Sequence, residues 1–349
     1  MERVIIERGG DRVLYLYANA PKSYQNFEGL PPISSADAHM RWHPVRREWV
    51  GYAAARQGRT HLPNQADCPL CPMQDANMPS DIPVDDYEIA IFTNRFSAFS
   101  LHAQNTVIDG MDTRAGKGLC EVISYSADHN ASLSTIGAER IALLIRAIGD
   151  RITALYAHED IVWSLPFENR GREIGVTLDH PHGQIYSLSI LPEPMKRQAD
   201  AMAEDKPLEG LAEKLDQNLI LDEAASAIAY VPPWARYPFE SWVMPKRAVD
   251  GPHQLSDDEI TELAMMIDST AKKLDAANDG PMPYTLAWQI APKTYEGQFH
   301  FHLTFQPLKR SKSKQKYLAS VEQITSLFLV DLAPERAARI LRGEEQTDE

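Results

Sequence analysis

Cysteine, positive charge and long apolar runs are all scarce in this 349-residue sequence. The three cysteines are too few, and odd in number, for the disulfide framework of a small secreted protein. Lys and Arg total 35 against 49 Asp and Glu, which gives a formal net charge of -14. Proteins hold phosphate backbones through excess Lys and Arg, so this charge argues against a nucleic-acid partner and favours small molecules.

The apolar segments are also too short to form a membrane span. Met1 to Arg3 lead into a short charged strand pattern and not into the apolar core of a signal peptide. Together with the few cysteines, this predicts a cytoplasmic protein with no membrane partner. The length suffices for a large core, built as two domains or as one internally duplicated unit.

The apolar periodicity predicts a mixture of strands and few long helices. Strands are predicted over 87–92, 120–125 and 184–191, and an amphipathic helix over 135–157. The pattern then recurs, with strands at 228–231 and 241–244 and a helix to about Ala276 that begins at a capping box of Ser256 and Glu259. Two short apolar runs, at 4–6 and 13–17, precede these elements in an extension, 1–40, whose role the sequence does not reveal.

The most informative segment is His180-Pro181-His182-Gly183-Gln184, at the start of a strand. Alternate residues of a strand share a face, so the two imidazoles and the amide converge on one point. A neutral histidine there can attack phosphorus, glycine allows a phosphate to approach closely, and Gln184 can donate a hydrogen bond to a phosphoryl oxygen. The alternative, histidines on a solvated strand face, accounts less well for three convergent groups.

A second histidine pair, His300 and His302, occupies a strand predicted over 299–306. Asn169 precedes His182 by 13 residues (182 - 169), and Gln289 precedes His302 by 13 residues (302 - 289). This equal spacing indicates a duplicated unit, with an acidic, helix-prone connector at about 193–218 between the copies.

The motif around His182 resembles the active-site signature of the galactose-1-phosphate uridylyltransferase family, a branch of the histidine-triad superfamily. The resemblance extends from about Arg41 to about Arg342. It implies an α+β fold of two fused histidine-triad-like half-barrel domains with antiparallel sheets and flanking helices, 41–195 with the His-Pro-His motif and a zinc site, and 196–349. Further motifs in the family's order are Cys68-Pro69-Leu70-Cys71, Phe92-Thr93-Asn94, Ser126-Ala127-Asp128-His129, Glu168-Asn169-Arg170-Gly171, Pro233-Trp234-Ala235 to Pro238-Phe239-Glu240, and Arg310-Ser311 after the second histidine pair.

The resemblance implies a nucleotidyltransferase with a covalent intermediate. His182 would attack the α-phosphorus of a nucleotide sugar such as UDP-glucose, and a sugar 1-phosphate would then take the uridylyl group from the histidine. Gln184 would meet the charge on phosphorus. The family's homodimer, whose active site is shared between subunits, is implied as well. The implied substrate-binding residues are Arg56, Arg59, Asn94, Asn169, Gly175, Thr177, Lys316 and Glu322.

Two other functions stay open from the sequence. One is a nucleoside-diphosphate-sugar phosphorylase or hydrolase of the same fold, with phosphate or water as the second acceptor. The other is a non-catalytic, zinc-stabilised nucleotide-binding protein.

Cys68 and Cys71 form half of a metal site, which needs two further ligands. The resemblance supplies His129 and His180, and so implies one structural zinc per chain; two buried thiols beside a surface histidine are the alternative. A second metal site of some family members is not expected, because Gln198 and Gln289 replace two of its ligands, and amides are poor ligands for transition metals. We expect hydrogen bonds to hold His300 and His302 instead.

The sequence departs from the family near its hexose-binding residues. Val321 replaces the tyrosine of a tyrosine-glutamate pair, leaving Glu322, and Phe328-Leu329 replaces a later glutamine. Losing such polar groups changes which substrate fits, so galactose 1-phosphate is not assured as the acceptor. Five cations cluster just before these positions, in a segment that closes over the partner subunit's sugar phosphate in the family: Lys309, Arg310, Lys312, Lys314 and Lys316.

Overall fold

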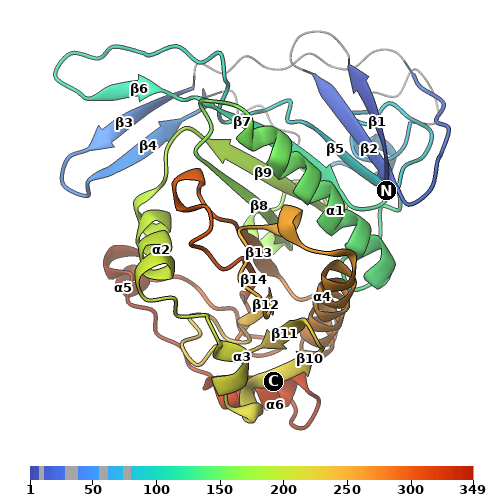
Figure 1. The fold of residues 1–349 in the computed structure, drawn as a ribbon, viewed down its shortest axis with the longest axis vertical. Helices are drawn as coiled ribbons and strands as arrows, with labels where there is room; N and C mark the ends of the chain where they lie inside the picture. Colours follow the sequence, from blue (N-terminus) through green and yellow to red (C-terminus); the bar gives the residue numbers. More distant parts are fainter. Residues whose placement is uncertain (8–11, 28–37, 55–61, 74–79, 349) are drawn as a thin grey trace.

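A single antiparallel sheet of eleven strands forms the centre of the molecule (Figure 1). The computed structural model describes residues 1–7, 12–27, 38–54, 62–73 and 80–348. The strand order is β1-β2-β5-β7-β9-β8-β13-β14-β12-β11-β10. In sequence order the strands are β1 (Glu2–Glu7), β2 (Val13–Ala18), β5 (Ile89–Thr93), β7 (Gly118–Ser124), β8 (Trp163–Arg170), β9 (His182–Leu188), β10 (Ile220–Glu223), β11 (Ala227–Tyr230), β12 (Ser241–Pro245), β13 (Tyr284–Gln289) and β14 (His302–Pro307).

The two halves of this sheet repeat each other about its central pair, β8 and β13. β9 flanks β8 just as β14 flanks β13, and β7 and β12 come next on either side. His182 and His302 therefore each begin a strand next to the centre. The duplication predicted from the spacing is confirmed, and the halves share one sheet. The domain limits themselves stay a prediction.

Two long helices cover one face of the sheet and pack against each other (Figure 1). α1 (Gly137–Tyr156) buries one apolar side against the first half of the sheet, and α4 (Asp257–Ala277) does the same on the second half. Arg146 of α1 pairs with Asp257 of α4 at 2.8 Å. The predicted capping box is confirmed, since Ser256 and Glu259 bond each other's backbone N–H groups.

The remaining elements lie at the margins of the sheet. A small sheet of β3 (His39–His43), β4 (Glu48–Tyr52) and β6 (Thr113–Ala115) projects from the first half (Figure 1). The predicted helix-prone connector contains α2 (Glu193–Glu204) and α3 (Leu211–Lys214). Near the C-terminus are α5 (Ser320–Thr325) and α6 (Pro334–Leu341). The extension 1–40 supplies β1 and β2, so it completes one edge of the main sheet.

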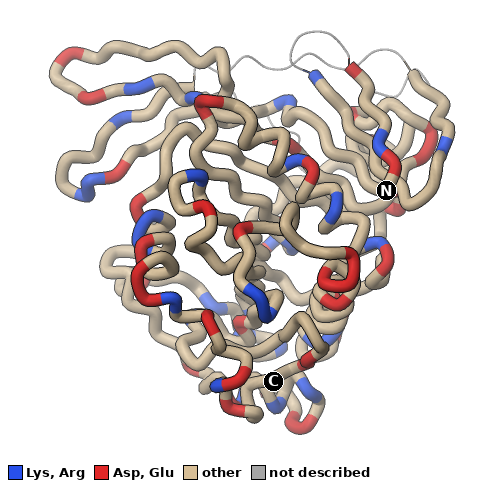
Figure 2. The backbone as a smooth tube through the Cα atoms, in the orientation of Figure 1, with Lys and Arg blue, Asp and Glu red and all other residues tan. Residues whose placement is uncertain are grey.

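Acidic and basic residues are interspersed along the visible backbone (Figure 2). None of the helices formed by the described residues combines the length and apolarity needed to cross a membrane.

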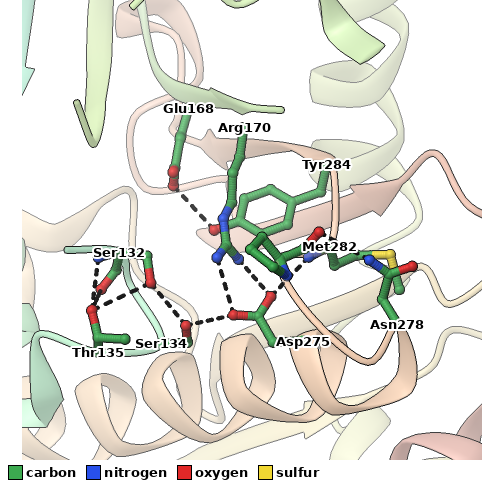
Figure 3. A network of polar contacts seen from close by, with 10 residues as sticks. Ser132, Ser134, Thr135, Glu168, Arg170, Asp275, Asn278, Met282 and Tyr284 are labelled. Atoms are coloured by element: carbon green, nitrogen blue, oxygen red, sulfur yellow. Dashed lines mark hydrogen bonds and ion pairs between the residues drawn. The ribbon is translucent and has the colours of Figure 1, made fainter. Parts of the chain in front are cut away.

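A partly buried polar network joins β8 of the first half to α4 and β13 of the second half (Figure 3). Arg170 of β8 forms two bonds with Asp275 of α4, at 2.7 and 3.0 Å, and Asp275 also accepts a bond from Ser134. Beside this pair, Glu168 accepts a bond of 3.3 Å from the hydroxyl of Tyr284. Burial raises the pKa of Glu168 to about 7, although the charge of Arg170 opposes the shift.

The raised pKa of Glu168 predicts that this residue lowers stability as pH rises. Between about pH 4.5 and 7, the folded state holds a proton that the unfolded state has released, so the free energy of unfolding falls with pH. The slope is about 1.4 kcal/mol per pH unit at its steepest. Glu168→Gln removes this slope, and urea unfolding from pH 5 to 7.5 should show the variant gaining stability relative to wild type. Equal pH dependence of the two proteins would contradict the burial argument; Glu173→Gln, on an exposed residue, is the control.

Candidate active site

The His-Pro-His motif lies at the edge of a pocket on the face of the sheet opposite α1. Successive residues of each strand point to opposite faces. Ile91, Ile123 and Ile185 belong to the core cluster that contains the residues of α1. Phe92, Val122 and Gln184, one residue away in each strand, line up across β5, β7 and β9 in the pocket wall.

His182 is held with one ring nitrogen bonded and the other available. Its Nδ1 donates to the backbone carbonyl of His180 at 2.8 Å, because a carbonyl can only accept. Nε2 therefore carries the lone pair. Burial lowers the pKa of the His182 imidazole, which favours the neutral form. Tautomer, orientation and charge all make Nε2 a nucleophile.

Gln184 is oriented by a chain of bonds that begins at the backbone. The N–H of Phe96 donates to Oδ1 of Asn94 at 2.8 Å, so the Nδ2 group of Asn94 is turned toward Gln184. It donates to Oε1 of Gln184 at 3.1 Å. The Nε2 group of Gln184 is thus left as a donor beside His182.

Gly183 occupies a position where no side chain fits. An added Cβ would lie 2.3 Å from Oη of Tyr125 and 2.7 Å from the carbonyl oxygen of Phe167. The backbone of β9 next to His182 is therefore packed closely against Tyr125 and Phe167.

The pocket is a hollow lined by side chains from the cysteine loop, the sheet and the segment before His182. It brings together four of the predicted residues, Asn94, Thr177, His182 and Gln184. The rest of its lining among the described residues is Pro69, Leu70, Asp81, Phe92, Arg95, Phe96, Val122 and Leu178.

Other predicted substrate-binding residues are not among those that line the pocket. Asn169, on β8, pairs with β13, and Gly175 is exposed with a left-handed φ of 77°. Lys316 and Glu322 are buried against each other, with Nζ and Oε1 2.6 Å apart. Arg56 and Arg59 lie outside the described residues.

Arg95 is a pocket residue that the sequence reasoning missed. Its guanidinium lies 4.7 Å from the centre of the Phe96 ring, and its buried Nε has no hydrogen-bond partner. No carboxylate among the described residues pairs with Arg95, and an arginine of this kind in a pocket is suited to an anion. Its position directly after the Phe92-Thr93-Asn94 motif was the available signal.

Cys68, Cys71, His129 and His180 form a cluster whose four ligand atoms lie within 4.8 Å of one another. Among the described residues, no other such group of histidine, cysteine and acidic side chains occurs. Sγ of Cys71 is 3.4 Å from Nδ1 of His129 and 3.5 Å from Nδ1 of His180. A tetrahedral zinc with ordinary bond lengths requires edges of about 3.6 Å, so this donor set fits a metal ion.

The protonation of the cluster also suits a cation. Nε2 of His180 donates to the carbonyl of Ser126 at 2.8 Å, which leaves Nδ1 as the ligand atom. Burial lowers the pKa of His180 to about 4, so the ring is neutral. Burial and the adjacent Cys68 raise the pKa of the Cys71 thiol to about 12, so the thiols need a nearby cation in order to ionise.

The second histidine pair repeats the local geometry of the first, but both of its rings are buried. Nδ1 of His302 donates to the carbonyl of His300, and Nε2 of His300 donates to that of Pro245, both at 2.8 Å. Gln198 donates to Nε2 of His302 at 3.4 Å, and the ring stacks on Trp242. The expectation that hydrogen bonds hold His300 and His302 is confirmed.

Comparisons with known proteins agree with the geometry. Residues 22–192 match the family model described as galactose-1-phosphate uridyl transferase, N-terminal domain, and residues 191–348 match that of the C-terminal domain. A galactose-1-phosphate uridylyltransferase of Thermotoga maritima is 33% identical, covering 88% of this chain and 98% of its own. An ADP-glucose phosphorylase of Arabidopsis thaliana is 25% identical, covering 89% and 94%. A solved structure titled as that of a uridylyltransferase is 25% identical, with a TM-score of 0.75, and covers 87% of this chain and 97% of its own.

The two family matches together span nearly the whole chain, and the Thermotoga relative aligns over almost its full length. This chain belongs to the galactose-1-phosphate uridylyltransferase family.

Proposed function

We propose that this protein moves a UMP group between a UDP-sugar and a hexose 1-phosphate through a uridylyl-histidine at His182. The observation that carries the proposal is the bond from Nδ1 of His182 to the carbonyl of His180, which leaves Nε2 free beside the amide of Gln184 at the pocket. Family membership supports the same reaction class.

The transfer proceeds in two displacements. Nε2 of His182 attacks the α-phosphorus, and the sugar 1-phosphate leaves with the electron pair of the broken P–O bond. The imidazole then carries a positive charge, which the bond from Nδ1–H to the His180 carbonyl stabilises. A phosphate oxygen of the second sugar 1-phosphate displaces the histidine and restores the neutral ring.

The groups around His182 are assigned to the phosphates. Gln184 donates to a phosphoryl oxygen as charge builds up on it, and Asn94 fixes that amide. Arg95 supplies a positive charge at the same pocket. We retain the predicted phosphate and nucleotide roles of Arg56, Arg59, Asn169, Gly175 and Thr177.

We also propose a homodimer with an active site shared between the subunits, formed through the segment that contains Lys316 and Glu322. Both lie in a segment that exposes a run of apolar side chains, and large exposed apolar patches mark interaction sites. We propose that a second copy covers this segment and brings it to its own pocket, with the buried pair of Lys316 and Glu322 holding the segment together. The exposed residues are Tyr317, Leu318, Val321, Ile324, Leu327 and Leu329.

Zinc is the ion we propose for the cysteine-histidine cluster, held by Cys68, Cys71, His129 and His180. The ion would fix His180, whose carbonyl orients His182. Its contribution would be structural. The three free cysteines also support the proposed cytoplasmic location.

A phosphorylase of nucleotide sugars is the second candidate function. One relative is named ADP-glucose phosphorylase, and the apolar residues near Glu322 favour an acceptor other than a hexose phosphate. Phe328 packs against Tyr237 and Arg236, so its ring is engaged within the chain. A non-catalytic nucleotide-binding role does not explain the oriented Nε2 of His182.

We predict that His182→Ala abolishes transfer while the protein stays folded, because the nucleophile is lost and the pocket walls remain. Wild type incubated with UDP-glucose radiolabelled in the uridine should keep an acid-labile, base-stable label on His182. His253→Ala, on an exposed histidine outside the pocket, should keep both label and turnover. Turnover that persists in His182→Ala would sink the covalent mechanism.

One zinc and no iron should copurify with each chain, and Cys71→Ala should lose that zinc together with thermal stability. Cys120→Ala removes a buried cysteine outside the cluster and should keep the metal. Elemental analysis and thermal unfolding measure both effects. Stoichiometric iron that disappears in a His300 variant, or wild type without zinc, would refute the assignment.

The acceptor preference should differ from that of a strict galactose-1-phosphate enzyme. Loss of two polar contacts at Val321 and Phe328-Leu329 can reorder sugar 1-phosphates by roughly a hundredfold. The measurement compares kcat/KM for galactose 1-phosphate, glucose 1-phosphate, amino-sugar 1-phosphates and inorganic phosphate. A fast, strongly preferred reaction with galactose 1-phosphate would show that the pocket recovers these contacts elsewhere.

A further inference from the structure

Asp81 is the only acidic residue among the described residues that line the pocket, and the reaction does not use it. The pocket must hold a diphosphate close to His182, where a carboxylate would repel it. Asp81 lies next to apolar residues of the lining. Its backbone N–H donates to the carbonyl of Pro69 at 2.8 Å, which places it beside Pro69 and Leu70.

The apolar part of the pocket lining has the chemistry of a nucleobase site. Its walls are apolar side chains from the cysteine loop and the sheet, and the flat faces of a base pack well on such walls. The lining residues concerned are Pro69, Leu70, Phe92, Phe96, Val122 and Leu178. A base packed on these walls would present its polar edge to a polar group of the lining.

The carboxylate of Asp81 is fixed with one oxygen engaged. Nη2 of Arg12 donates to Oδ1 at 3.1 Å, and both side chains are buried. Oδ2 receives no hydrogen bond from any described residue. This oxygen is also not fully buried. Arg12 thus holds Asp81 so that a single acceptor is available to the pocket.

We infer that Asp81 reads the base of the nucleotide by accepting a hydrogen bond from N3–H of uracil at Oδ2. The inference rests on the proposed function and adds base specificity to it. Uracil carries a hydrogen on N3, whereas cytosine has a lone pair there, which faces the carboxylate unfavourably. A hydrogen bond to a charged group discriminates by roughly 10- to 150-fold.

The ion pair with Arg12 makes the effect of Asp81→Asn specific. The guanidinium keeps the amide oxygen at the Oδ1 position, because an N–H group cannot accept its hydrogen bond. The amide Nδ2 then replaces Oδ2 as the group facing the pocket. A donor replaces an acceptor, so the variant should prefer CMP over UMP.

Calorimetric titration of the whole protein with UMP, CMP and 3-methyl-UMP tests the inference without turnover. Wild type should bind UMP roughly 10- to 150-fold more tightly than the other two. Asp81→Asn should reverse the order of UMP and CMP, with melting temperature and metal content confirming that it is folded. Asp86→Asn is the matched control, because Asp86 is paired with Lys22 at the surface and does not line the pocket.

Three outcomes are decisive. Equal binding of UMP and 3-methyl-UMP by wild type overturns the role of Asp81, and this comparison stands even where the variant fails to fold. An unchanged preference in folded Asp81→Asn overturns it as well. If wild type binds UMP and His182 still becomes labelled by radioactive uridine, the proposed function survives both of these results. If wild type binds none of the three nucleotides, the proposed function fails as well.

Discussion

The hydrogen bond from His182 to the carbonyl two residues earlier is the constraint on which the site depends. It fixes the tautomer with Nε2 unprotonated at the pocket, and in the proposed mechanism it would stabilise the positive charge on the ring. That carbonyl belongs to His180, whose own ring is bound to the Ser126 carbonyl and to the cysteine-histidine cluster. A metal bound to His180 would therefore hold in place the carbonyl that orients His182. The segment from His180 to His182 thus contains both a residue of the cluster and the oriented histidine.

The second copy of the motif shows what this hydrogen bond cannot do alone. His302 has the same bond to His300, in the equivalent strand, yet its Nε2 meets the amide of Gln198 and its ring stacks on Trp242. The ring is fully buried, and burial lowers its pKa to about 4. An oriented histidine becomes a reaction centre only where the neighbouring strands leave a pocket at Nε2. Duplication thus supplied two equivalent histidines, of which one has a substrate-accessible side.

The sequence predicted those elements that are determined by residues close together in the chain. The helix that begins at Ser256 and the histidine strands were predictable because capping and alternation involve residues close in sequence. The joining of both halves across β8 and β13 was not, because strand pairing between duplicated units leaves no local signal. Nor was the partnership of Lys316 with Glu322, or the place of Arg95, since each depends on how distant segments pack.

The extension that the sequence left unexplained has a place in this arrangement. Arg12 immediately precedes β2, the strand that borders β5 in the sheet, and it reaches Asp81 across 69 positions of sequence. The backbone of Asp81 is bonded to Pro69, which lies between the two cysteines of the cluster, and His180 belongs to the same cluster. The cluster is therefore linked both to Asp81, the residue proposed to contact the base, and to His182, the proposed nucleophile. A change in the cluster should therefore affect the positions of both residues, because each is bonded to a residue that belongs to the cluster or lies between its cysteines.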